Sequence, residues 1–576
     1  MKKKKNRSLR RSHKAQVQDA QKAGAIPSFF VNYKTILIHL GLAVLSSILF
    51  AASFPNILIK NGLPFLAWFA YIPILVVIRK NGFLACAGWG AFFGLASYAL
   101  FNYWLGTFHP LAGTIVYSIY IVYLAVVFLF LKLADFLFPK RAYLVQWLIW
   151  LAYEYLRTKG FLGYSYGITG YSQWRVIPLI QIASITGVWG VSALVTFPSF
   201  ALADALKNWR VSEGWRAVVN ALALFCNREK ISAAAFTAVF IASITFGIVT
   251  SRDFSSFPKA QIALIQHNTD PWRASRAPAK WEISETYRKD LTVLKRLSDE
   301  ALASEPKPQM IVWPETAFVP RIYWHNNYRD DQSSWALVRE LLEYLSEKDT
   351  PFLLGNDDAR MEPARNPNAD EKHRVDYNAA LLFEKGEISS AYRKIHLVPF
   401  TEHFPYKKQF PSFYNFLEKA DTHFWEKGKE ETVFKGPGFT FSAPICFEDT
   451  FGYLSRGFVR RGADVLVNIS NDAWSNSLPA QNQHLSMAVF RAVENYRPMV
   501  RSTSSGQTCA IDPQGRITAM ASPFSEAWIN VSVPLTSGST LYTLYGDYLA
   551  IAFTLMSIFM LLFGAVSCTI KKTSKG

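Results

Sequence analysis

Three residues of this chain, Glu315, Lys394 and Cys446, have side chains that together could perform covalent acyl transfer. Each follows directly on a short apolar run, where α/β folds place functional groups. A cysteine is a strong nucleophile once its proton has been taken by a base such as a carboxylate. An ammonium group can then stabilise the oxyanion that forms on the attacked carbonyl. We therefore predict one active site in which Glu315 is the base, Lys394 the oxyanion partner and Cys446 the nucleophile.

The local sequence around Cys446 predicts a corner between a strand and a helix. The apolar run 439–445 reads as a buried strand, and Glu448-Asp449-Thr450 has the composition of a helix start. A helix N-terminus lowers the pKa of a thiol and offers free backbone N–H groups. A buried cysteine is usually inert, so the reading of Cys446 as a nucleophile depends on its partners.

The segment from 258 to 533 alternates strands with amphipathic helices, which predicts an α/β domain whose sheets are covered by helices. Polar residues return here at the frequency of a soluble protein. The expected strands are 261–266, 310–313, 352–355, 378–384, 438–445, 464–469, 507–511 and 527–533, and the expected helices lie near 281–297, 335–345, 450–461 and 480–497.

The remainder of the 576-residue chain is strongly apolar and predicts a membrane domain of seven helices, followed by one closing helix after the α/β domain. A helix needs about 20 apolar residues to cross a bilayer. Suitable runs lie at 35–53, 62–78, 83–105, 112–136, 142–157, 184–205, 232–250 and 546–568. The expected division is a basic tail at 1–34, a membrane domain at 35–250, the α/β domain at 258–533 and the last helix at 546–568.

The distribution of basic residues predicts the orientation in the membrane. Residues 1–34 contain ten Lys or Arg against one acidic residue, about half of the net charge of +18. This tail should stay in the cytoplasm, and seven crossings then put the α/β domain outside. The first apolar run is long and soon followed by others, so we expect an uncleaved anchor.

Several other functions are disfavoured by the sequence. No basic patch interleaved with aromatic residues indicates nucleic-acid binding, and no His or Cys spacing is typical of a metal site. Acidic residues of the apolar runs lie near their ends, which disfavours a transporter. Gly163 to Gly167 matches G-x-S-x-G, but it follows a membrane helix and not a strand, so we treat it as a chance match. A Cys–His hydrolase using His396, His403 or His484 is a weaker alternative.

Around Glu315, Lys394 and Cys446 the chain resembles the nitrilase, or carbon–nitrogen hydrolase, superfamily, whose catalytic set is Glu, Lys and Cys in this order. With helices before and after that domain, it more closely resembles the apolipoprotein N-acyltransferase family. The motifs that carry this resemblance are Trp313-Pro314-Glu315, Tyr377-Asn378, Leu397-Val398-Pro399-Phe400, Ile445-Cys446, Ser470-Asn471-Asp472-Ala473-Trp474, Gln483-His484, Arg491-Ala492, Glu494, Arg497, Arg501 and Gly506, with Gly170-Tyr171-Ser172-Gln173 in the membrane part.

The resemblance implies an αββα sandwich and a ping-pong acyltransferase without a cofactor. The donor would be a membrane phospholipid and the acceptor a diacylated apolipoprotein, at the outer face of a bacterial cytoplasmic membrane. Glu402 and Glu448 would orient Lys394, the Phe447 N–H would help to bind the oxyanion, and Trp281, Asn378 and Trp474 are candidate substrate-binding residues. Phe447, Thr401 and Ser504 replace the family's usual Tyr, Gly and Asn. A membrane-anchored amidase with the same three residues is the main alternative, and it would pass the acyl group to water.

Overall fold

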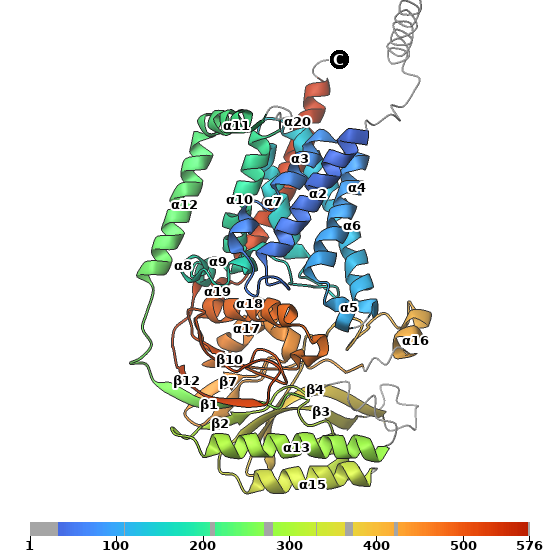
Figure 1. Ribbon diagram of the computed structural model, residues 1–576, viewed down its shortest axis with the longest axis vertical. Coiled ribbons are helices and arrows are strands. Elements are labelled where there is room, and N and C mark those ends of the chain that lie inside the picture. Colours follow the sequence, from blue (N-terminus) through green and yellow to red (C-terminus); the bar gives the residue numbers. More distant parts are fainter. Residues whose placement is uncertain are drawn as a thin grey trace, which may run out of the picture.

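The computed structural model describes residues 33–108, 110–207, 214–269, 280–329, 331–362, 373–419 and 424–573. Figure 1 shows two parts along the long axis: a helical bundle at one end and two packed sheets with their helices at the other. Helix α2 is the first described element and α20 is the last. The start of α2 and the end of α20 both lie at the end of the bundle away from the sheets.

Six helices among the described residues are long and apolar enough to cross a membrane. They coincide with six of the eight expected runs, and the chain therefore has a helical membrane part. These helices are α2 (Tyr33–Ser53), α4 (Phe83–Phe101), α6 (Pro110–Leu137), α10 (Val188–Ala205), α12 (Lys230–Val249) and α20 (Tyr548–Thr573).

Of the other two runs, 142–157 forms one helix over nearly the whole of its expected range, whereas 62–78 does not form a single helix. Run 62–78 divides into η1 (Pro64–Trp68) and α3 (Ile72–Lys80), each with a proline in its first turn. Proline is tolerated there but cannot continue a preceding helix. Run 142–157 forms α7 (Ala142–Leu156), which packs among α6, α10 and α20. The smaller elements of this part are α5 (Leu105–Phe108), η2 (Thr169–Gln173), α8 (Ile177–Ile180), α9 (Ala183–Thr186), α11 (Gly214–Arg228) and α19 (Leu541–Tyr545).

The pair α4 and α6 packs through the glycines of a G-x-x-x-G pattern. A Cβ on Gly90 would collide with the carbonyl oxygen of Leu124, and one on Gly94 with that of Tyr120. Glycine therefore allows these two backbones to approach closely, as its spacing in the sequence predicts.

The α/β part is a sandwich of two six-stranded sheets. One sheet has the order β12-β1-β2-β3-β4-β5 and the other β11-β10-β9-β8-β7-β6. Helices α13 (Lys280–Leu302) and α15 (Gln332–Ser346) cover the first sheet, whereas α17 (Gly452–Arg460) and α18 (Leu478–Asn495) lie between the second sheet and the bundle (Figure 1). The expected αββα architecture is confirmed.

The strands of the first sheet have one face on α13 and α15 and the other on the second sheet. In β1, Ala263 and Ile265 belong to the core under those helices, whereas Ile262 and Leu264 belong to the core between the sheets. Burial on both faces explains the nearly continuous apolar runs of the sequence. The strands are β1 (Lys259–Gln266), β2 (Met310–Val312), β3 (Phe352–Glu362), β4 (His373–Glu384), β5 (Glu387–Arg393), β6 (Phe434–Gly436), β7 (Phe439–Ser442), β8 (Val465–Ser470), β9 (Met499–Thr503), β10 (Cys509–Ile511), β11 (Ile517–Met520) and β12 (Ala527–Pro534).

Four strands (β5, β6, β9 and β11) and several helices lie outside the ranges expected from the sequence. Strand β9 is buried along its whole length, but it contains the charged residue Arg501, so its sequence does not have the apolar pattern of a buried strand. Strands β6 and β11 are short and lie at the edges of their sheet. These helices include α11, in the basic loop before α12, α14 (Ile322–Tyr328) and α16 (Pro411–Lys419).

Candidate active site

The three predicted catalytic residues lie just beyond strand ends of the two sheets. Glu315 follows β2, Lys394 directly follows β5, and Cys446 begins the 3-10 helix η4 (Cys446–Thr450) after β7. The Ile445 backbone still pairs with Ile469 of β8. Strand pairing therefore fixes the backbone up to the residue before the cysteine.

Lys394 is fully buried and its ammonium group lies between two carboxylates. Its Nζ is 2.8 Å from Glu402 Oε1 and 3.3 Å from Glu315 Oε1. Burial alone would lower the pKa of Lys394, but the two carboxylates outweigh it and the pKa lies above the ordinary value. The lysine is thus a permanent cation at neutral pH, as an oxyanion partner must be.

Glu315 is held in one orientation by three donors. Asn378 Nδ2 donates to Oε1 at 2.8 Å, Lys394 to the same oxygen, and the Asn471 backbone N–H to Oε2 at 3.0 Å. Glu315 as a whole residue is only 5% exposed. A base fixed in this way loses little entropy when it reacts.

Cys446 has a positive φ of 50°, a conformation that non-glycine residues adopt rarely. Its carbonyl accepts a hydrogen bond from Asn468 Nδ2 at 3.2 Å. Burial and the negative charge of Glu315 raise the pKa of the Cys446 thiol to about 12, although Lys394 and His484 act in the opposite direction. The resting group is therefore a thiol, and its reaction needs a base.

Glu448 positions the backbone on both sides of the site, and within the described residues it makes no hydrogen bond or ion pair with Lys394 Nζ. Its carboxylate accepts from the backbone N–H of Ile395, His396 and Ile445 at 2.8 to 2.9 Å. It also accepts from the Tyr392 hydroxyl at 2.8 Å. Burial raises the pKa of Glu448, and the backbone donors oppose that shift. Glu402 instead meets Lys394 itself, and its Oε2 accepts from the Val398 N–H.

The remaining candidates lie at different distances from this centre. Asn378 contacts Glu315, as described above, and Phe447 packs its ring against Phe451 and His396. Trp474 is half-buried in η5 (Asp472–Ser475), close in sequence to the Asn471 that binds Glu315. Trp281 lies in the first turn of α13, and its side chain lies outside the described part of the structure.

The histidines do not provide a base for Cys446. Burial lowers the pKa of His396 to about 3, and its Nδ1 lies 2.8 Å from the Tyr453 hydroxyl. Both ring nitrogens of His484 are engaged by carboxylates, those of Asp449 and Asp472. His403 follows Glu402 directly, and burial lowers its pKa too. Ser165 of the G-x-S-x-G match lies in an irregular segment between α7 and η2, not at a strand-to-helix turn.

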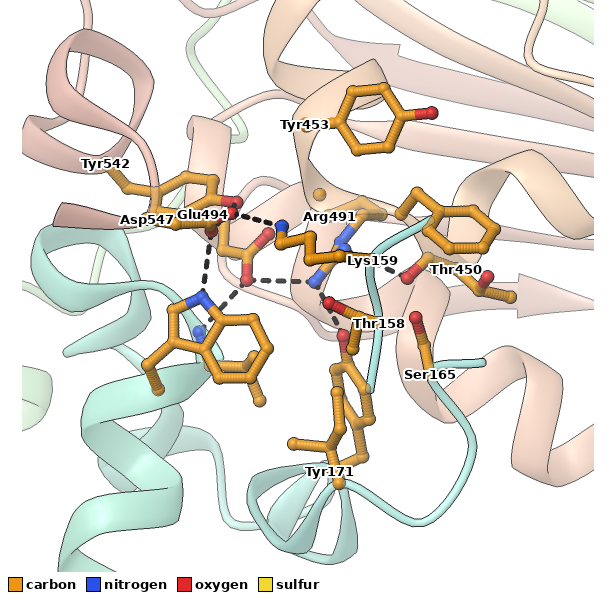
Figure 2. Close-up of a pocket in the computed structure, with 15 residues that line it drawn as sticks. Thr158, Lys159, Ser165, Tyr171, Thr450, Tyr453, Arg491, Glu494, Tyr542 and Asp547 are labelled. Carbon is orange, nitrogen blue, oxygen red and sulfur yellow. Dashed lines mark hydrogen bonds and ion pairs between the residues drawn. The ribbon is translucent and has the colours of Figure 1, made fainter. Parts of the chain in front are cut away.

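The segment after the nucleophile turn lines a pocket between the sheets and the bundle (Figure 2). Arg491 of α18 donates to the Thr450 carbonyl at 3.3 Å, to the Tyr171 hydroxyl at 3.1 Å and to Glu494 at 2.9 Å. Glu494 in turn accepts from the Val188 N–H at the start of α10. Burial raises the pKa of Glu494 to about 7, with Arg491 opposing. The turn that carries Cys446 is thereby attached to the membrane part.

Sequence reasoning assigned no role to several residues that build this site. Tyr392, Asn468 and Asn471 orient Glu448, Cys446 and Glu315 respectively. Polar residues inside or directly after strands β5 and β8 were the available signal, because such residues are paired when they are buried.

The fold and the Glu–Lys–Cys arrangement define a protein of the carbon–nitrogen hydrolase class, and the family model described as carbon–nitrogen hydrolase matches residues 261–540. The model for the apolipoprotein N-acyltransferase N-terminal domain matches residues 46–201. The chain belongs to the apolipoprotein N-acyltransferase family, as its relatives show.

"Apolipoprotein N-acyltransferase 1" of Treponema denticola is 44% identical over 93% of this chain and 98% of its own length. The protein of the same name from Treponema pallidum is 46% identical over 91% of this chain and 95% of its own length. Among solved structures, an amidase from Nesterenkonia sp. AN1 aligns with 49% of this chain and 94% of its own, at 18% identity and a TM-score of 0.33.

Proposed function

We propose that this protein transfers a fatty acyl chain from a membrane phospholipid, through a thioester on Cys446, to the N-terminal amine of the S-diacylglyceryl-cysteine of apolipoproteins. The observation that carries the proposal is the buried Lys394 ammonium held between Glu315 and Glu402, in a domain that contacts a membrane bundle. Glu315 and Lys394 also act electrostatically on Cys446. The names of the relatives support the same acyl acceptor.

In the first half-reaction, Glu315 takes the proton of the Cys446 thiol as Sγ attacks the ester carbonyl carbon of the phospholipid. The oxyanion of the tetrahedral intermediate is stabilised by the Lys394 ammonium and by the Phe447 backbone N–H, which lies in the first turn of η4 and has no partner within that helix. The C–O bond then breaks, the alkoxide takes the proton from Glu315, and lysophospholipid leaves. A thioester remains on Cys446.

In the second half-reaction, the neutral α-amine of the apolipoprotein attacks the thioester carbonyl and Glu315 accepts a proton from the amine. The same two donors hold the oxyanion. The C–S bond breaks, the thiolate of Cys446 recovers a proton from Glu315, and the amide product leaves. This is a ping-pong scheme with one covalent intermediate, and it needs no cofactor.

An aromatic cluster next to Glu402 supports a lipid substrate. Phe161, in the segment after α7, packs against Phe400, Phe404 and Tyr406 with ring centroids 5.1 to 6.1 Å apart. Nearby α16 exposes the large apolar side chains of Phe413 and Phe416. An apolar rim that joins the membrane part to the site would admit acyl chains and keep water from the thioester.

We further propose the division of the chain expected from the sequence, with a cytoplasmic tail at 1–34, membrane segments at 35–250 and 546–568, and the catalytic domain at 258–533. The membrane would be the bacterial cytoplasmic membrane, with the catalytic domain on its outer face. The positive charges at both chain ends support this orientation, because basic segments stay inside.

The experiment that tests the function is mass spectrometry of the Cys446 peptide after incubation with phospholipid. The native protein should gain a hydroxylamine-labile fatty-acyl increment that a diacylated lipopeptide amine discharges. Cys446→Ala should gain none, and Glu315→Gln should gain it at least 100-fold more slowly. A preparation that hydrolyses amides but never carries an acyl group from phospholipid would replace this proposal by the amidase alternative.

A further inference from the structure

Four buried charged side chains lie next to the nucleophile turn and have no part in the mechanism above. They are Asp449 of η4, Asp472 of η5, His484 of α18 and Arg501 of β9. The side chains of Asp449 and Arg501 are fully buried, and those of His484 and Asp472 are at most 7% exposed. Burying four charges is costly unless each is paired, so their pairing must be close to complete.

The contacts of His484 require both of its ring nitrogens to carry a proton. Nε2 lies 2.6 Å from Asp449 Oδ1, and Nδ1 lies 3.0 Å from Asp472 Oδ1. An ionised carboxylate can only accept hydrogen bonds, so the histidine has to donate on both sides. Ring nitrogens that both donate define an imidazolium cation.

Arg501 completes the pairing from the sheet side. Its guanidinium donates to Asp449 Oδ2 and, at 3.3 Å, to Asp472 Oδ2. Its Nη2 also lies 3.3 Å from His484 Nδ1, but the Asp472 carboxylate satisfies this donor and is the closer partner of Nδ1. Each carboxylate therefore meets one guanidinium and one imidazolium nitrogen, and two negative charges balance two positive charges.

The balance matters for Cys446, because the cluster acts on its thiol. Asp472 raises the pKa of the Cys446 thiol and His484 lowers it. A neutral imidazole would leave one unbalanced carboxylate beside the sulfur. That charge would oppose every step in which negative charge forms on Sγ.

A second buried histidine shows that this environment is particular to His484. Burial lowers the pKa of His267 to about 4, and its Nδ1 has no hydrogen-bond partner in the described structure. Burial acts on His484 in the same direction, but interactions with Tyr166 and with the Asp472 carboxylate outweigh it and raise the pKa of His484 to about 10. Similar burial therefore gives a neutral ring in one place and a cation in the other.

The cluster also holds the strained turn of the nucleophile. Asp449 lies three residues after Cys446 in the same short helix, and Cys446 has its rare positive φ of 50°. Such a conformation persists only when its surroundings hold it. His484 and Arg501 clamp Asp449 from α18 and β9, which are different elements of the fold.

We propose that His484 is a positioning residue that remains an imidazolium throughout the reaction, holding Asp449 and balancing Asp472 so that Sγ of Cys446 can become negative. His484 neither gives nor takes a proton in this proposal, and the thiol proton still goes to Glu315. The inference rests on the proposed function only in taking Cys446 as the nucleophile.

Five groups from four places in the chain face His484: Asp449 and Cys446 of η4, Asp472 of η5, Arg501 of β9, and Tyr166 of the segment between α7 and η2. The Tyr166 ring centroid lies 6.4 Å from that of His484. The Tyr166 carbonyl accepts from Arg157 at 2.8 Å.

The test is the rate at which iodoacetamide alkylates Cys446 between pH 6 and pH 10, read by peptide mass spectrometry with exposed Cys226 as an internal reference. We expect His484→Gln to slow alkylation of Cys446 at least tenfold at each pH up to 9. His484→Gln combined with Asp472→Asn restores neutrality and should recover the rate to within about threefold of native. His39→Gln removes a buried histidine of α2 and should change nothing.

A purely structural role predicts a different pattern. The double variant would then be slower than either single variant, and this result would overturn the proposal, as would a native rate in His484→Gln. If the variants do not fold, NMR of the native protein labelled at histidine Cε1 decides: a resonance of the protonated form should persist at pH 8, and only neutral rings at that pH would refute the inference. Alkylation needs no lipid, so a failed acyl-transfer assay with a normal alkylation result would count against the proposed function alone.

Discussion

At the scale of residues, the charged groups that surround each buried side chain of the site determine its protonation state. Lys394 keeps its proton because Glu315 and Glu402 both face it, whereas the Cys446 thiol keeps its proton because burial and Glu315 disfavour a thiolate. A thiol with a pKa of about 12 has almost no thiolate at neutral pH. Proton transfer to Glu315 during the attack is therefore the physical requirement that the surroundings of Cys446 impose.

His484 and His267 should make the stability of the protein depend on pH in opposite ways. The pKa of folded His484 is raised above its unfolded value of 6.5, so its stabilisation is complete below pH 6.5 and is lost as the pH rises through about 10. The pKa of His267 is lowered, so its contribution is present above pH 6.5 and is lost as the pH falls through about 4.

We therefore expect the apparent unfolding temperature of the purified protein to fall by several degrees (~3–8 °C) between pH 7 and pH 10, with a smaller fall in His484→Gln. Thermal unfolding followed by intrinsic tryptophan fluorescence checks this. His267→Gln serves as the comparison and should keep the native slope in that range. If the unfolding temperature of the native protein and of His484→Gln fell equally with pH, His484 would not carry the positive charge assigned to it.

At the scale of elements, close approach of backbones decides which helices pair. Gly90 and Gly94 of α4 allow contact with α6, whereas Gly88 of the same helix has nothing within 4 Å of the Cβ that it lacks. A methyl group at the first two positions must push the helices apart, and at Gly88 it meets open space.

Gly94→Ala should accordingly destabilise the bundle by about 1–3 kcal/mol, the usual cost of overpacking. Gly88→Ala should be neutral or slightly stabilising, because alanine has the higher helix propensity. Denaturation in detergent, followed by circular dichroism, measures both. Equal effects of the two substitutions would show that the α4–α6 contact is looser than described.

At the scale of the whole molecule, α18 joins the catalytic residues to the membrane part. Gln483 accepts from Trp104 at 3.0 Å and donates to the carbonyls of Pro55 and Phe101 at 2.9 and 3.0 Å. Together with Arg491 and Glu494, it docks the domain on the ends of several membrane segments. Lipid substrates that enter from the bilayer would then meet a site whose position relative to the membrane is fixed.

Orientation is testable with two cysteines on opposite sides. Exposed Cys226 lies in α11, at the end of the bundle away from the sheets, and exposed Ser346 ends α15 (Figure 1). In intact spheroplasts of cells producing Ser346→Cys, a membrane-impermeant maleimide should label position 346, and Cys226 only after lysis. Labelling of Cys226 before lysis would reverse the proposed topology.

The sequence by itself determined the class of fold, most of the strands and helices, and the three central residues of the candidate site. Apolar periodicity predicts elements because each strand or helix must bury one or two faces. Glu315, Lys394 and Cys446 could be selected because each follows an apolar run and their chemistry is complementary. Six helices that could cross a membrane were readable from the length and apolar character of their runs. Run 62–78 does not form one helix, because its prolines lie in the first turns of two shorter ones.

Only the tertiary structure decided which charges are paired. Asp449, Asp472, His484 and Arg501 come from four separate elements, and nothing in their spacing shows that they meet. The charge state of a buried histidine depends on its spatial neighbours, so His267 and His484 could not be distinguished by sequence. Strand β9 was overlooked for the same reason, since a buried arginine is compatible with a strand only when folding brings carboxylates to it.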